Sequence, residues 1–164
     1  MRKLLMLAGM LCLGMLPAIA DPMPPVNPDK ALYIVKVEPG VSYEDVVTSL
    51  KSAAESKNFV SPASFPIGEH IKQRGLPLQG VLEVRTYCSL GIGAEILLEY
   101  PEFAAFAPCR IAIYEKQNQL YLGLDRPTYD LKSIKNPTAR AVQSAQTLED
   151  ALIQLMEKAR RGDF

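Results

Sequence analysis

The stretch VLEVRTYCSLGIGAEILLEYPEFAAFAPCRIAIYEKQNQLYLGLD, residues 81–125, decides the fold of this chain. A strand ending at Cys88 is followed by a helix, and a second strand opens at Cys109. Gln117-Asn118 then predicts a tight turn, because Asn accepts the left-handed backbone that two-residue hairpins need. The predicted elements are a strand over 81–88, a helix over 90–100, a strand over 109–115 and a return strand over 119–125.

Alternation along the strand over residues 81–88 predicts which of its faces points to the core. Successive side chains of a strand lie on opposite faces, so every second residue shares an environment. Glu83 and Arg85 are expected to face solvent. The residues of the predicted core face are Leu82, Val84, Thr86 and Cys88.

The flanking segments supply further strands and helices. The helix over residues 43–57 is expected to begin with a capping box of Ser42 and Asp45 and to stop at Asn58, which accepts a left-handed backbone, and the last helix is expected to begin by Thr147. The remaining elements are a strand over 31–38, a short strand at 59–60 and a short helix within 69–74. The order β-α-β-(α)-β-α-β-β-α predicts an α+β fold, with a mainly antiparallel sheet and helices packed on one face. A single domain is expected over 31–162.

The N-terminus has the pattern of a secretory signal peptide. Arg2 and Lys3 precede a 13-residue apolar run, and an Ala-Ile-Ala sequence then ends at Ala20. Basic, apolar and small residues in this order are typical of a signal that is removed on export. The apolar run is shorter than the roughly 20 residues of a membrane-spanning helix. We therefore expect residues 1–20 to be cleaved before Asp21, which predicts a periplasmic or secreted protein.

Composition limits the partners of the exported chain. The lead over residues 21–30 holds four prolines and is expected to be an extended spacer. Removal of Arg2 and Lys3 reduces the basic residues from 18 to 16, against 18 acidic residues, which gives a net charge of −2. The chain lacks the excess of basic residues that is typical of nucleic-acid-binding proteins. After residue 20, no apolar run is long enough to span a membrane. The expected partner is a small ligand or another protein.

Several short motifs resemble the domain-of-unknown-function family 302. The matching pieces are Thr86-Tyr87-Cys88, the sequence FAPCRIAIYE over 106–115, Asp125-Arg126-Pro127 and Asn136-Pro137. The resemblance covers most of residues 31–161. The separation of 21 between the two cysteines is similar to a two-cysteine subgroup, which usually has Cys-Asn-Pro where this chain has Cys-Ser-Leu. The resemblance implies a compact α+β fold and no assigned activity.

Cys88 and Cys109 are the one pair with chemical promise, and we expect their Cα atoms to lie within about 7 Å, the reach of a disulfide. In an oxidising compartment they can form a structural disulfide, which would stabilise the fold by roughly 3 kcal/mol. Paired thiolates also bind soft metals such as copper or zinc. Cys88 precedes a predicted helix, whose N-terminus can activate a thiol. Two unlinked buried thiols remain the fourth interpretation.

The other candidate residues are His70, the one histidine, and the glycines Gly91 and Gly93. His70 can serve as a third ligand or a proton shuttle, and the glycines permit close packing or approach of a ligand. The leading hypothesis is a non-catalytic exported accessory protein that binds a small ligand or soft metal ion near Cys88 and Cys109. The alternatives are a thiol redox or hydrolytic enzyme that uses Cys88, and a purely structural disulfide in an interaction module.

Overall fold

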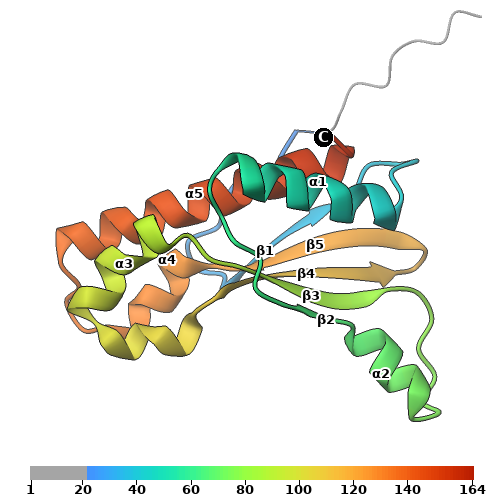
Figure 1. Ribbon diagram of the computed structural model, residues 1–164, viewed down its shortest axis with the longest axis horizontal. Helices are drawn as coiled ribbons and strands as arrows, with labels where there is room; N and C mark the ends of the chain where they lie inside the picture. The colour runs from blue at the N-terminus through green and yellow to red at the C-terminus, as the bar shows by residue number, and fades with distance from the viewer. Residues whose placement is uncertain (1–21) are drawn as a thin grey trace, which may run out of the picture.

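Five antiparallel strands form one sheet in the computed structural model, which describes residues 22–164 (Figure 1). The first strand in the chain is an edge of the sheet and pairs with the last. The strands in spatial order are β1 (Leu32–Lys36), β5 (Gln119–Asp125), β4 (Cys109–Lys116), β3 (Leu82–Tyr87) and β2 (Ser64–Phe65). The predicted α+β class with an antiparallel sheet is confirmed.

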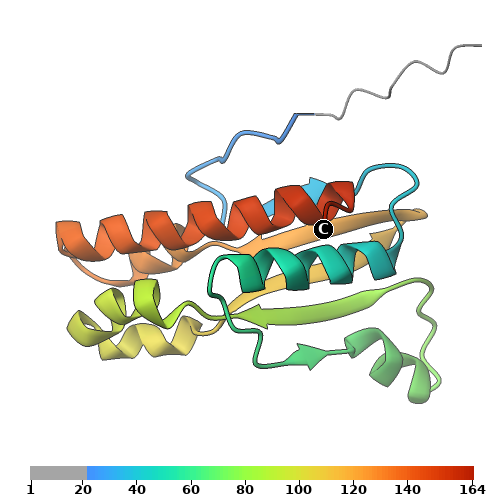
Figure 2. The same ribbon diagram turned by 45° about the horizontal axis from the view of Figure 1, so that its top comes forward.

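Two long helices, α1 (Tyr43–Ser56) and α5 (Ala139–Arg161), lie side by side over one face of this sheet (Figures 1 and 2). A short helix, α2, lies beyond one end of the strands, and the remaining helices gather at the opposite end. These shorter elements are α2 (Ile67–Gln73), α3 (Leu90–Glu99), η1 (Pro101–Phe106), α4 (Pro127–Asp130) and η2 (Leu131–Ser133). Within residues 22–164, no helix is long and apolar enough to cross a membrane.

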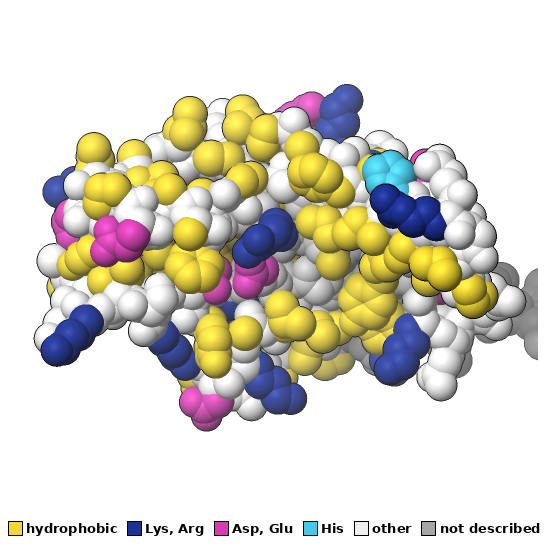
Figure 3. Space-filling model, turned by 90° about the horizontal axis from the view of Figure 1, so that it is seen from below, with side chains coloured by type: hydrophobic (Ala, Val, Ile, Leu, Met, Phe, Trp, Pro, Cys, Tyr) yellow, Lys and Arg dark blue, Asp and Glu magenta, His cyan; other side chains and the backbone are white. Residues whose placement is uncertain are grey.

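The main core lies between the sheet and the two long helices. Alternate residues of the central strands point toward the helices and are fully buried, as are Leu50 of α1 and Leu152 of α5. The buried strand residues are Ile111, Ile113, Leu122 and Leu124. No helix of the described chain covers the opposite face of the sheet, which is seen in Figure 3. The fold is therefore a two-layer sandwich with one open face.

Strand β3 has the opposite orientation to the one predicted. Its Glu83 pairs directly with Ile113 and its Arg85 pairs with Ile111, so both polar residues lie on the helix-covered face. Leu82 and Val84 lie on the open face. A shift of one residue exchanges the two faces of a strand, and the alternation within 81–88 is too weakly apolar to fix which face is inward.

Local sequence signals are confirmed in three places. Ser42 and Asp45 form the expected capping box at the start of α1. The hairpin between β4 and β5 turns through Gln117 and Asn118 with φ angles of 53° and 58°, the left-handed backbone of a two-residue turn. Asn58 has a φ of 56° just after the end of α1, where it was expected to stop the helix.

The start of the last helix was predicted too late. Helix α5 begins at Ala139, after an N-cap at Thr138 whose hydroxyl accepts from the Ala141 N–H. Thr147 lies inside the helix and donates to the Gln143 carbonyl. Small residues carry the buried stripe through the first turns, so the strongly apolar part of the pattern marks only the second half. The short strand predicted at residues 59–60 is only an isolated bridge between Val60 and Cys88. The strand β2 lies a few residues later, at Ser64–Phe65.

The proline-rich lead is fastened to the domain by a buried arginine. Arg126 donates to the carbonyl oxygens of Asn27 (2.5 Å) and Lys30 (2.7 Å). Its guanidinium also pairs with Glu149 of α5 at 2.9 Å, and both side chains are at least 95% buried. Glu149 in turn accepts from the backbone N–H of Thr128 at 3.0 Å. One ion pair thus joins the lead, the end of β5, α4 and α5.

Candidate functional site

Polar and aromatic side chains occupy the helix-covered side of β3, where a core strand would carry aliphatic residues. The residues in this row are Glu83, Arg85 and Tyr87. Glu83 is 5% exposed and Tyr87 is 1% exposed. Buried charges are expensive unless they are paired, so each member of the row should have a partner.

The partners are present within the row and on α1. The Tyr43 hydroxyl donates a short hydrogen bond to Glu83 Oε2, and Arg85 Nε lies 2.9 Å from Glu83 Oε1. Burial, followed by the hydrogen bond to Glu83, raises the pKa of Tyr43 above its ordinary value. Burial also raises the pKa of Tyr87 well above its ordinary value. Both phenols are therefore protonated at neutral pH, and Glu83 holds Arg85 in place.

A groove of about 400 Å³ opens beside this row. Arg85 and Tyr87 form its β3 side, and α1 with the following loop forms the other side. Its remaining lining residues are Lys51, Ala54, Glu55, Phe59, Val60 and Ser61. A smaller hollow of about 140 Å³ includes Tyr43 and Glu83 among its lining residues. The groove lies within the 300–1,000 Å³ range of small-molecule sites.

The groove combines two kinds of contact. Arg85 has a side chain that is 22% exposed, and Lys51 adds a second cation on α1. Phe59 and Tyr87 supply aromatic surface, and both are largely buried. Arginine binds carboxylates through parallel hydrogen bonds. A small molecule with a carboxylate and an apolar body would therefore match the groove.

The structure brings the two predicted cysteines to one small cavity. Tyr87 lies directly opposite Cys109 in the sheet, and Cys88 is the next residue. Cys88 exchanges backbone hydrogen bonds of 2.9 and 2.8 Å with Val60, which orients the end of the strand. Both cysteines line a cavity of about 40 Å³, with Tyr87 between it and the groove. This volume is enough for little more than ordered water.

The two cysteines are free thiols in the structure, so the disulfide, one of the four interpretations of this pair, is not observed. Burial raises the pKa of the Cys109 thiol to about 12, and the neighbouring Cys88 thiol adds to the rise. Thiolates are the nucleophiles and the metal ligands, so Cys109 is poorly suited to either task. Among residues 22–164, no group of three or more His, Cys, Asp or Glu side chains could hold a metal ion.

The remaining predicted site residues are dispersed. His70 is exposed on α2, which lies beyond the opposite end of β3 from the cysteines (Figure 1). Gly93 lines the cysteine cavity, whereas Gly91 is exposed on the same first turn of α3. A methyl group built on either glycine would meet no atom within 4 Å, so close packing, the simplest expectation, does not explain them. The predicted cleavage site at Ala20 and Asp21 lies outside the described residues.

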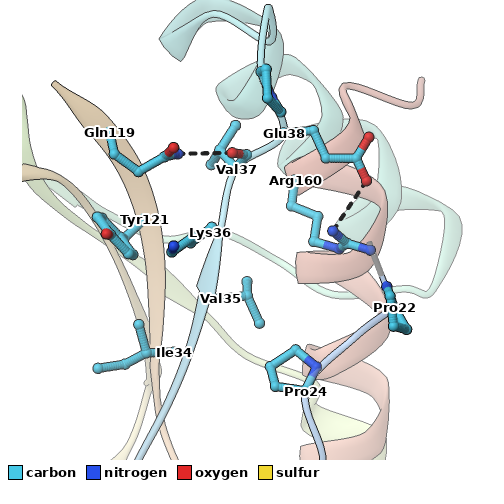
Figure 4. A pocket seen from close by; sticks show the side chains of 11 residues that line it. Pro22, Pro24, Ile34, Val35, Lys36, Val37, Glu38, Gln119, Tyr121 and Arg160 are labelled. Carbon is cyan, nitrogen blue, oxygen red and sulfur yellow. Dashed lines mark hydrogen bonds and ion pairs between the residues drawn. The ribbon is translucent and has the colours of Figure 1, made fainter. Parts of the chain in front are cut away.

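A second large cleft, of about 510 Å³, lies along the edge strand β1 (Figure 4). Pro22 and Pro24 of the lead form one side, and Tyr121 lies on the other. Arg160 reaches into the cleft from α5 and pairs with Glu38 at 3.1 Å. Arg160 pairs with the carboxylates of both Glu38 and Glu157, whereas Arg85 of the groove beside β3 pairs with Glu83.

Known proteins share the sequence pattern and the fold of this chain. A family model described as "Domain of unknown function DUF302" matches residues 33–159. The chain belongs to the DUF302 family. An uncharacterised protein from Aquifex aeolicus (strain VF5) is 41% identical over 90 residues, which are 55% of this chain and 56% of that protein. The match therefore spans little more than half the length of that relative.

A solved DUF302 structure shows the same architecture. The crystal structure of an uncharacterised conserved DUF302 protein from Bacillus stearothermophilus superposes with a TM-score of 0.70. The alignment covers 79% of this chain and 98% of that one, at 20% sequence identity. At this identity the likeness supports the fold of the DUF302 domain and leaves its activity to the residues of the site.

Sequence reasoning missed the groove because it assigned Glu83 and Arg85 to solvent. One signal favours the observed orientation: Tyr87, the largest apolar side chain of the strand, shares their face. The register with β4 gives the same orientation, because Tyr87 and Arg85 lie directly opposite Cys109 and Ile111. The candidate site therefore lies on β3 itself and not at the end of the strand.

Proposed function

We propose that this DUF302 protein is an exported accessory protein that binds a small carboxylate in the groove beside β3. The observation that carries the proposal is Arg85, a cation that Glu83 fixes within a groove of about 400 Å³. A side chain held in this way loses little conformational freedom when a ligand binds, which favours affinity. The ligand carboxylate accepts from Arg85, and its apolar body lies against Phe59 and Tyr87.

The groove supports ligand binding better than the cysteine cavity does. The cavity at Cys88 and Cys109 is about a tenth of the volume of the groove, at about 40 Å³ against 400 Å³. Metal binding at the cysteines would need further ligands, and His70 lies too far along the fold to be an obvious third one. Placement in a two-cysteine subgroup of DUF302 remains a prediction from sequence.

Export is the second part of the proposal, and the basic, apolar and small residues of positions 1–20 support it. Expression in a bacterial host with a periplasm is expected to give a protein that begins at Asp21. Intact mass of the periplasmic fraction measures this directly. Recovery of a mature species that still carries Arg2 would contradict the proposal of cleavage.

Binding can be tested by thermal unfolding with a panel of small aromatic and aliphatic carboxylates. A ligand at about 100 times its Kd stabilises the folded state by about 2.7 kcal/mol, which raises the Tm measurably. The Arg85→Gln substitution is expected to weaken binding about 10- to 100-fold, because it removes a charged hydrogen bond worth roughly 1.5–3 kcal/mol. Amides of the same shape lack the negative charge that Arg85 recognises. Their affinity for the wild type should therefore be no higher than the affinity of the carboxylates for Arg85→Gln.

Arg74→Gln is the matched control, because Arg74 is an exposed arginine at the end of α2, outside the lining of the groove. This variant should bind the same carboxylates as tightly as the wild type. Equal loss of binding in both variants would indicate a nonspecific charge effect. Absence of any stabilising carboxylate across the panel would remove the proposed ligand class.

A further inference from the structure

The open face of the sheet is unusually apolar for a surface without a helix over it. We define the open face as the strand residues that point away from α1 and α5. Its members are Leu32, Ile34, Lys36, Phe65, Leu82, Val84, Thr86, Arg110, Ala112, Tyr114, Lys116, Gln119, Tyr121, Gly123 and Asp125. Figure 3 shows hydrophobic side chains gathered across this side of the molecule. A solvated face of an antiparallel sheet normally carries polar residues.

Large side chains of the open face are exposed or tightly grouped. Leu32, Ile34 and Phe65 are 54%, 44% and 51% exposed. Tyr114 and Tyr121 stack with ring centroids 5.3 Å apart and planes 10° from parallel. Gly123 lies beside the Tyr114 ring, so the centre of the face is flat. Contiguous apolar surface of this kind marks an interaction site.

We propose that the open face binds the open face of a second copy of this chain. The five strands range from two residues in β2 to eight in β4, and at about 3.4 Å per residue and about 4.8 Å spacing they cover roughly 460 Å². Two such faces bury roughly 900 Å², close to the lower limit of about 1,000 Å² for a specific protein interface. Stacked sheets lie about 10 Å apart, a distance that interdigitated Tyr, Ile and Phe side chains fill.

Charge on the open face favours a twofold arrangement. Lys36 and Lys116 lie at one end of the strands, where Lys36 pairs across to Tyr121 and Lys116 to Gln119. Asp125 lies at the other end in an ion pair with Arg110. Asp130 follows in α4, close enough to interact electrostatically with both. The first end thus has two uncompensated lysines and the second has one carboxylate in excess.

A twofold axis that lies midway between the two stacked sheets, parallel to them and across the strands, places opposite ends of the two copies together. The lysine end of one copy then lies over the acidic end of the other, and the same contact forms twice. Symmetric dimers use self-complementary surfaces in this way. An arrangement with strands parallel would instead place the two lysine ends together, and like charges oppose it.

Sedimentation equilibrium of the purified protein tests the dimer. The wild type is expected to have twice the monomer mass at 100 μM, and Ile34→Glu is expected to raise the dimer Kd at least tenfold. Phe65→Glu on the same face should act in the same direction, and circular dichroism checks that each variant folds. Lys36→Glu combined with Lys116→Glu should also weaken the dimer, because it places acidic groups at both ends.

Leu98→Glu is the matched control, since Leu98 is 80% exposed on α3 and lies outside the open face. This variant should dimerise as the wild type does. The proposal is overturned by a monomeric wild type at 100 μM. It is equally overturned if Ile34→Glu and Phe65→Glu both dimerise normally, or if Leu98→Glu dissociates the dimer to the same extent.

Discussion

Replacement of Glu149 by Ala is expected to reduce the free energy of unfolding by about 3–5 kcal/mol, the usual cost of breaking a buried ion pair from one side. Glu149 is 1% exposed, and its partner Arg126 is 4% exposed. Without the carboxylate, the guanidinium keeps its two backbone carbonyl acceptors in the lead and loses its counter-ion. The Thr128 N–H also loses its acceptor at the start of α4.

Urea denaturation monitored by circular dichroism measures this loss. Asp150→Ala is the matched control, because Asp150 is the next residue of α5 and is exposed. Its hydrogen bond from Gln146 is on the surface, so its removal should cost at most about 0.5 kcal/mol. Equal stabilities for the two variants would show that the buried pair contributes no more than an exposed carboxylate does.

Replacement of Leu152 by Ala is the second large expected effect, with a loss of about 2–5 kcal/mol. Leu152 is 0% exposed on the buried stripe of α5, within the core that the helix shares with the sheet. The substitution removes apolar contacts and leaves a cavity that rigid neighbours on both sides cannot fill. The urea midpoint should fall while the slope of the transition stays constant.

Leu98→Ala is the corresponding control for the same change in side chain. Leu98 is 80% exposed on α3, so truncation removes little buried surface. It should change the free energy of unfolding by less than about 0.5 kcal/mol. A loss below about 1 kcal/mol for Leu152→Ala would contradict the packing of α5 on the sheet.

The parts of the fold that the sequence predicted are those with a local physical cause. The capping box of Ser42 and Asp45 and the turn at Gln117 and Asn118 depend on residues next to each other in the chain. The facing of β3 depends on its register with β4, which no residue of β3 specifies alone. The start of α5 was missed because its cap at Thr138 precedes a stripe of small residues, whose apolar signal is weak.

In the candidate site, too, the features set by nearby residues were predicted and those set by tertiary packing were missed. Sequence reasoning placed Cys88 and Cys109 in one neighbourhood, and both line one cavity. It placed His70 and the glycines around them, although their positions depend on where α2 and α3 pack. Arg85 was missed because its value as a site residue depends on Tyr43 and Glu83, which only the packed helix layer brings together.

The pairing of the first strand with the last has a consequence for the order in which the chain can fold. Leu32 pairs with Asp125, and α1 packs on α5 at the far end of the sequence. A chain that emerges from a ribosome with its N-terminus first has β1 without its partner strand until β5 has emerged, and α1 without its neighbouring helix until α5 has emerged. Contacts of such long range also slow folding, because a large loop must close before they form. The sheet can therefore be completed once β5 has emerged, whereas the helix layer over it is completed only when α5 has emerged.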